Sequence, residues 1–304
     1  LAQDAGAINL SQGFPDFDVS PELIDRVRHY MQTGCNQYAP TQGVPTLRTA
    51  IAAKAEALYG ACYDAETEIT ITSGATEALY AAVTAVVRPG DEVIIIEPAY
   101  DAYEPAVRLN GGLPVYVPLS FPAFRVDWEA VGRCITPHTR ALILNTPHNP
   151  TGMALEADDI SALKKIVDRK DLLIISDEVY EHIVFDGRPH RSMASLPELK
   201  ACSFVVSSFG KTYHATGWKV GYCMAPVAFT TEFRKIHQYL TFATNTPVQL
   251  ALADHLSGSD DHLNLADFYQ RKRDHFHRLL AGSRFKPLAC HGTYFQMVDY
   301  SAIT

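Results

Sequence analysis

The chain has 304 residues, of which 47% are hydrophobic and 20% are charged, and its formal net charge at pH 7 is −8. This length predicts one large domain and part of a second. The acidic balance argues against nucleic-acid or anionic membrane partners, which need clustered Lys and Arg, and no apolar run reaches the roughly eighteen residues of a membrane span.

The six cysteines are scattered along the chain without a C-x-x-C pair. This is typical of reduced thiols in a cytoplasmic enzyme rather than of a disulfide framework or a zinc site. The twelve histidines include no pair at ligand spacing backed by a carboxylate, so we predict no metal. Residues 1–13 lack the basic start of a signal peptide, which also favours the cytoplasm.

In chain order, Ser20-Pro21 and Pro45 predict two helix starts, and Gly60 is suited to end the second helix. Further helices are predicted over residues 76–87 and 158–167. Strands are predicted over 69–72, 92–96, 113–117, 140–144, 172–176 and 204–207. Short strands separated by helices indicate βαβ crossovers, hence an α/β fold with a mostly parallel central sheet and helices on both faces.

After Gly221 the pattern predicts three more helices, over residues 229–240, 248–255 and 263–280, and then a strand over 292–298. We expect this last part to begin a small α+β domain. The predicted organisation is therefore an N-terminal segment (1–20) that belongs to the small domain and covers the active site, a large domain (21–255), and the incomplete start of a C-terminal small domain (256–304).

Polar groups gather where the predicted strands end. Ser73-Gly74-Ala75 follows the first strand at a helix start, and the turn 145–152 with Asn149 follows the fourth. Asp177 and Tyr180 follow the fifth strand, and Lys211 follows the sixth. Because chemistry in open α/β sheets lies at the carboxyl ends of the strands, we expect these groups to form one site at neighbouring strand ends.

This combination matches the needs of pyridoxal phosphate. The cofactor requires a lysine amine for its aldehyde, a carboxylate for its pyridine nitrogen, donors for its phenolic oxygen, and a helix N-terminus for its phosphate. Singly, the residues have ordinary explanations: Asp177 as a strand-end cap, Tyr100 as core packing and Lys219 as a surface lysine. The rival nucleotide motifs fail, because Val205 stands where a P-loop needs glycine and no G-x-G-x-x-G follows a strand.

Seven segments, in order along nearly the whole chain, resemble the class I/II aminotransferases of PLP fold type I, in particular their methionine and kynurenine aminotransferase branch. They are NLSQGFPDFD (9–18), NQYAPTQG (36–43), TSGATEAL (72–79), EPAYDAY (97–103), NTPHNPTG (145–152), ISDEVYEH (175–182) and SSFGKTYHATGWKVGY (207–222). The last two segments together are specific for this family.

The resemblance implies a role for each matching residue. Lys211 forms the Schiff base with the cofactor and then shuttles the substrate proton. Asp177 pairs with the pyridine nitrogen, Asn149 and Tyr180 bond the phenolic oxygen, and Tyr100 stacks on the ring.

Further roles follow from the same resemblance. The phosphate lies on the backbone of Gly74 and Ala75, with Ser208 and Lys219 supplying a hydroxyl and a charge. Tyr38 reaches the phosphate of a neighbouring subunit, so a homodimer is implied. The substrate-binding residues implied are Gly13 and Asn149.

The implied function is ping-pong transfer of an amino group from an L-amino acid to a 2-oxo acid. Methionine is the favoured donor and aromatic amino acids come next, with Phe14 and Phe242 as candidate pocket walls. The family's carboxylate-binding arginine has no match here, so we expect the sequence to be part of a longer chain. A PLP-dependent β-lyase acting on cystathionine or cysteine conjugates remains the alternative, and a ligand-sensing regulator of the same fold is disfavoured by the acidic charge.

Overall fold

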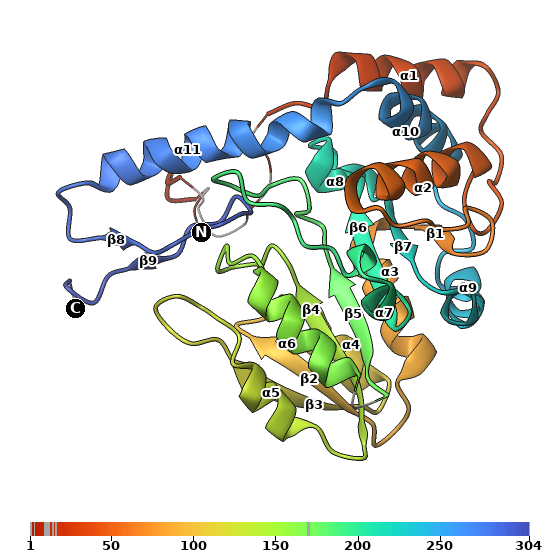
Figure 1. Ribbon diagram of the computed structural model, residues 1–304. Coiled ribbons are helices and arrows are strands. Elements are labelled where there is room, and N and C mark those ends of the chain that lie inside the picture. The colour runs from red at the N-terminus through yellow and green to blue at the C-terminus, as the bar shows by residue number, and fades with distance from the viewer. Residues whose placement is uncertain are drawn as a thin grey trace.

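A computed structural model describes residues 2, 4–8, 13, 15, 17–168 and 171–303 of the chain. Its centre is a seven-stranded sheet with the order β1-β7-β6-β5-β4-β2-β3 (Figure 1). The strands are β1 (Ile69–Thr72), β2 (Glu92–Glu97), β3 (Leu113–Pro118), β4 (Thr139–Asn145), β5 (Leu173–Asp177), β6 (Ser203–Ser208) and β7 (Gly221–Met224).

Neighbouring strands run parallel except at β7, which is antiparallel to both β1 and β6. The predicted α/β fold with a mostly parallel sheet is confirmed. The prediction that all four site-bearing strands are neighbours is wrong, because β7 lies between β1 and β6. The sequence analysis did not predict β7, because this strand has only four residues and begins at a glycine.

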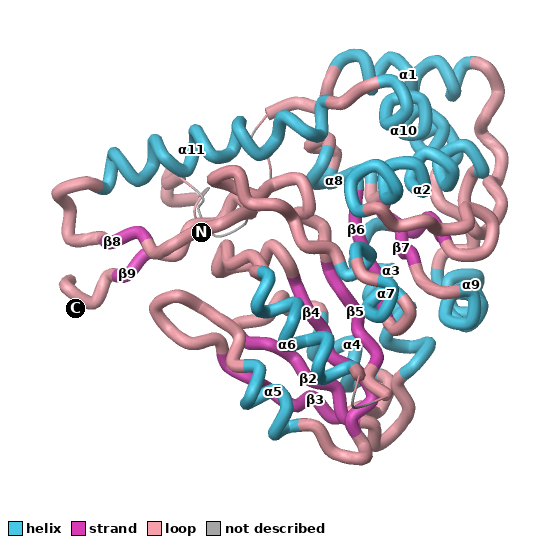
Figure 2. The backbone as a smooth tube through the Cα atoms, in the orientation of Figure 1, coloured by secondary structure: helices cyan, strands magenta, loops and turns pink. Residues whose placement is uncertain are grey.

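Helices cover both faces of the sheet (Figure 2). The α-helices of the described chain are α1 (Pro21–Gln32), α2 (Pro45–Tyr59), α3 (Gly74–Val86), α4 (Tyr103–Leu109), α5 (Trp128–Cys134), α6 (Ala157–Val167), α7 (Pro197–Lys200), α8 (Phe209–Thr212), α9 (Val227–Leu240), α10 (Thr246–Gly258) and α11 (Leu265–Leu280). The two predicted proline starts are correct, but the Ser20 side chain makes no capping hydrogen bond. Proline's fixed φ and missing N–H suit the first turn without it.

The alternation of side chains along a strand divides the core into two parts. On β2, Ile94 and Ile96 pack with residues of α1, α2, α6 and α10, whereas Val93 and Ile95 pack with residues of α3, α4 and α9. All four β2 side chains are buried. A strand buried on both faces reads as a continuous apolar run, which is why β2 was predictable from sequence.

The C-terminal part departs from the prediction. Residues 292–298 were predicted as a strand, but only Val298 lies in one, because β9 (Val298–Asp299) pairs briefly with β8 (Lys286–Pro287). The preceding backbone instead bonds to two turns at the carboxyl edge of the sheet: Gly292 N donates to Gly152 O, and Thr293 N donates to Ile183 O. These bonds bring residues 294 and 295 to the site described next.

The small β8–β9 ribbon runs alongside α11 at the margin of the molecule (Figure 1). The domain boundaries at residues 20 and 255 stay predictions. No helix in the described part of the chain is long and apolar enough to cross a bilayer.

Candidate active site

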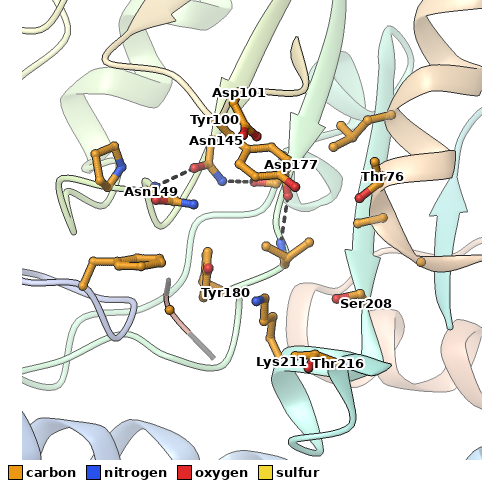
Figure 3. A pocket seen from close by; sticks show the side chains of 18 of the residues that line it. Thr76, Tyr100, Asp101, Asn145, Asn149, Asp177, Tyr180, Ser208, Lys211 and Thr216 are labelled. Atoms are coloured by element: carbon orange, nitrogen blue, oxygen red, sulfur yellow. Dashed lines mark hydrogen bonds between the residues drawn. The ribbon is translucent and has the colours of Figure 1, made fainter. Parts of the chain in front are cut away.

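A cavity of ≈ 560 Å³ opens at the carboxyl edge of the sheet, between the ends of β4, β5 and β6 and the start of α3 (Figure 3). Ten of the eleven predicted site residues line it, drawn together from the N-terminal segment, the strand ends and the loops that follow them. They are Gly13, Gly74, Ala75, Tyr100, Asn149, Asp177, Tyr180, Ser208, Lys211 and Lys219.

Asp177 ends β5 and carries the buried carboxyl group of the cavity. Its Oδ2 accepts a hydrogen bond from the Tyr103 hydroxyl at 2.7 Å, and its Oδ1 accepts one from Val179 N at 3.3 Å. Burial raises the pKa of Asp177 to about 6, against the opposing effects of these two donors. A positively charged ligand group beside the carboxylate is therefore the partner that this position favours.

The turn after β4 is fixed to β5 by Asn145. Its Nδ2 donates to Asp177 O at 2.9 Å, and its Oδ1 accepts from Asn149 N at 2.6 Å. Figure 3 shows these bonds as a chain that leads from Asn149 to the end of β5. Because the backbone of Asn149 is held in this way, its side chain is presented to the cavity at a defined position.

Lys211 lies on the opposite side of the cavity, in α8 directly after β6. Its Nζ donates to the Tyr294 hydroxyl at 2.7 Å and lies 5.8 Å from the centre of the Tyr180 ring. Burial and the neighbouring Tyr294 raise the pKa of Tyr180 well above its ordinary value. Tyr180 therefore remains a neutral phenol that can donate a hydrogen bond at physiological pH.

The start of α3 forms the third wall. Gly74, the first residue of this helix, has φ +79°, and a Cβ there would lie 3.2 Å from Lys219 Nζ. A Cβ on Gly221 would lie 2.8 Å from Ala75 N, so glycine permits β7 to approach the helix start. The first N–H groups of a helix have no partner within the helix, and with the positive end of the helix dipole, Lys219 and Ser208 they suit an anion such as a phosphate.

Tyr38 is the predicted site residue that the structure does not bring to this cavity. Its side chain is 81% exposed and its ring meets Phe242 edge-on, with the ring centres 5.2 Å apart. Phe242 does not line the cavity of its own chain either. Phe14 lies outside the described residues.

Four residues of the site were not assigned from sequence: Tyr103, Asn145, Tyr294 and Phe295. A signal existed for the first two, since Tyr103 follows Tyr100 by three residues at a helix start and Asn145 ends a predicted strand. Tyr294 and Phe295 lie in a segment without a motif, and only the tertiary fold brings them to Lys211.

The fold and the cavity with its lysine and buried aspartate define a class of enzyme, and sequence comparison identifies the family. Residues 5–304 match the family model described as aminotransferase class I and II, and the chain belongs to this family. The predictions of an aminotransferase and of its fold type are thereby confirmed.

Individual relatives agree with this assignment. The chain is 53% identical to methionine aminotransferase of Escherichia coli (strain K12), a match that covers 100% of this chain and 79% of that protein. It is 34% identical to kynurenine–oxoglutarate transaminase 1 of Homo sapiens, with coverages of 99% and 76%. A solved structure from Escherichia coli, described with a methionine aminotransferase function, has a TM-score of 0.98 and covers 100% of this chain and 80% of that one.

Proposed function

We propose that this enzyme uses pyridoxal 5′-phosphate to transfer the amino group of an L-amino acid, methionine by preference and aromatic amino acids next, to a 2-oxo acid. One observation carries the proposal. The amine of Lys211, the buried carboxyl group of Asp177 and the N-terminus of α3 line the same cavity from three sides.

The residues present fit this cofactor. Asp177, whose pKa is raised to about 6 by burial, would be held ionised by a protonated pyridine nitrogen. The α3 N-terminus with Ser208 and Lys219 would hold the phosphate, and the Lys211 amine would bond the aldehyde. The bound cofactor supplies the electron sink that stabilises the carbanion left when the substrate α-proton is removed.

The protein's own groups have distinct tasks in this reaction. Lys211 Nζ is the base that takes the proton from the substrate α-carbon. Tyr180 and Asn149 would supply donors to the phenolic oxygen, and Tyr100 would cover the ring face. Gly13, whose backbone lies against the Phe295 ring, and Asn149 would bind the substrate carboxylate.

The substrate preference is supported by the similarity of the chain to a methionine aminotransferase and to a kynurenine transaminase. The apolar groups Leu79, Tyr100 and Phe295 line the cavity and suit an uncharged side chain. Pockets of this kind discriminate by only about 1–3 kcal/mol per methylene, so we expect several amino acids to be accepted.

A homodimer is part of the proposal. The exposed aromatic pair Tyr38 and Phe242 lies close to Tyr239 and Leu240, which are 85% and 47% exposed. Large exposed apolar groups of this kind mark an interaction surface, and Tyr38 would reach the partner's cavity from it. We place the enzyme in the cytoplasm, where its six unpaired cysteines would stay reduced.

The test is to add L-methionine, without an oxo acid, to the purified protein loaded with pyridoxal phosphate. Conversion of the cofactor to pyridoxamine phosphate, with one equivalent of the corresponding 2-oxo acid, is expected, and Lys211→Ala should abolish it. A loaded protein that leaves methionine unchanged but releases pyruvate and ammonia from cystathionine would instead be a β-lyase.

A further inference from the structure

Tyr294 contacts the reactive lysine, although no motif marked it. Its hydroxyl accepts a hydrogen bond from Lys211 Nζ at 2.7 Å and donates one to the carbonyl oxygen of Gly13 at 3.2 Å. The Lys211 amine also lies 5.3 Å from the centre of the Tyr294 ring. A single side chain therefore joins the amine to the N-terminal segment proposed to bind the substrate carboxylate.

The position of Tyr294 is set by the surrounding structure. The backbone of Gly292 and Thr293 is bonded to Gly152 O and Ile183 O, at the turns after β4 and β5. The Tyr294 ring packs edge-on against Tyr180, with the ring centres 5.4 Å apart. Rigid support of this kind is what a residue needs in order to orient another one.

Gly13 is shaped to receive this ring. A Cβ at Gly13 would lie 2.4 Å from Phe295 Cε1 and 2.9 Å from Tyr294 Cε2, so any larger residue would force these rings to shift. Glycine therefore lets the Gly13 backbone lie against both rings, where its carbonyl accepts the Tyr294 hydroxyl.

We propose that Tyr294 is a positioning residue of the proposed transamination, which holds the Lys211 amine by a hydrogen bond and ties it to the substrate-binding Gly13. A lysine side chain has several rotatable bonds, and a base must reach the proton that it abstracts at hydrogen-bond distance. When Lys211 Nζ takes the α-proton, the electron pair of the C–H bond stays on the substrate. The Tyr294 hydroxyl keeps its own proton, directed at Gly13 O.

The experiment compares Tyr294→Phe with Tyr269→Phe as a matched control. Both variants remove one phenolic hydroxyl and keep the ring, and the two ring centres are 5.7 Å apart. The Tyr269 hydroxyl is buried and has no hydrogen-bond partner among the described residues, so it cannot hold Lys211. Because both variants keep their ring packing, we expect both to fold, which thermal unfolding checks.

The first readout uses the protein without cofactor. Pyridoxal phosphate is added, borohydride is used to trap its bond to the lysine, and peptide mass spectrometry measures the labelling rate at Lys211. Labelling should slow roughly two- to tenfold in Tyr294→Phe, the effect expected for losing one hydrogen bond that holds the amine in place, and should be unchanged in Tyr269→Phe. Absence of labelling in the unmodified protein would overturn the proposed function itself, and this inference with it.

The second readout is the half-reaction of the loaded enzyme with L-methionine and with its α-deuterated form. In Tyr294→Phe the maximal rate should fall over the same range and the deuterium isotope effect should rise, while the KM for methionine stays within about twofold. A hydroxyl with a merely structural role would not change the isotope effect. Equal behaviour of Tyr294→Phe and the unmodified enzyme, or equal losses in both variants, would overturn the positioning role.

Discussion

At the scale of single residues, two buried carboxyl groups four positions apart have opposite properties. Burial raises the pKa of Asp177 to about 6, and the donors that bond it, Tyr103 and Val179, are neutral. Burial acts in the same direction on Glu181, but Lys54 and several hydrogen bonds outweigh it and hold the pKa of Glu181 well below its ordinary value. Asp177 is thus suited to a cationic ligand, whereas Glu181 is already paired within the protein.

The raised pKa of Asp177 gives a prediction for the cofactor-free protein. Its folded-state pKa of about 6 exceeds the ordinary value of 3.8, so its contribution to stability is fully present below about pH 4 and is lost as the pH rises through 6. Relative to Asp177→Asn, the unmodified protein should lose about 2 kcal/mol of unfolding free energy between pH 4 and pH 7.

Urea unfolding of both proteins at a series of pH values measures this difference. The asparagine is neutral throughout and supplies one acceptor oxygen instead of two, which shifts the stability by an amount independent of pH. A difference in unfolding free energy that stays constant across the series would contradict the pKa assigned to Asp177. Bound pyridoxal phosphate should reduce the pH dependence of this difference, since a protonated ring nitrogen stabilises the ionised carboxylate.

At the scale of elements, the ends of β5, β6 and β7 are joined to α2 by a buried polar network. Lys54 Nζ, from α2, donates to Glu181 Oε1 at 2.7 Å and to the Tyr222 hydroxyl at 2.5 Å. Glu181 Oε1 also accepts from Ser207 Oγ at 2.5 Å. Because Glu181 follows Tyr180 and Ser207 precedes Ser208, the network fixes the backbone beneath two residues of the site.

Lys54→Met should destabilise the protein by about 3–5 kcal/mol, since it leaves the buried Glu181 carboxylate without its countercharge. The double variant Lys54→Met/Glu181→Gln should recover a large part of this loss, because no uncompensated charge remains. The matched control is Lys235→Met, which breaks the exposed Lys235–Glu232 pair and should cost less than about 1 kcal/mol. Chemical unfolding measures all three, and a double variant no more stable than Lys54→Met would show that the charge is not the cause.

The elements also show how far the sequence can predict this fold. Buried strands such as β2 and β5 are continuous apolar runs with helices between them, so their existence and parallel order were predictable. The segment 292–298 has the composition of a strand, yet its backbone bonds to the turns after β4 and β5 instead of to a neighbouring strand. Local composition carries no information about which distant carbonyl groups will accept a hydrogen bond.

At the scale of the whole molecule, some residues of the site could be predicted from the sequence and others could not. Lys211, Asp177 and Asn149 lie in motifs at strand ends, where the fold class alone indicates a shared cavity. Tyr294 lies 83 residues after Lys211, in a segment without a motif, and meets it only because the C-terminal chain crosses the edge of the sheet. The position of Tyr38 could not be predicted from one chain, because its exposed side chain lies outside the cavity of its own chain.

The proposed dimer gives a prediction that distinguishes a site shared between two chains from a site formed by one chain alone. If Tyr38 serves the partner's cavity, then Tyr38→Ala on one chain and Lys211→Ala on the other place both defects in the same site of a two-fold dimer. The second site then has an intact lysine and an intact partner tyrosine. Heterodimers with different tags, purified after co-expression, should show about half the activity of the unmodified dimer, although each single-variant homodimer is strongly impaired.

The activity of the heterodimer distinguishes the two models. The same two substitutions are present in both cases, and only the site to which Tyr38 contributes differs. If Tyr38 acted within its own chain, each site of the heterodimer would carry one defect and activity would stay as low as in the homodimers. Light scattering of the same samples establishes that they are dimers, and substitution of Phe242, which meets Tyr38 edge-on, provides a second position at which to repeat the pairing.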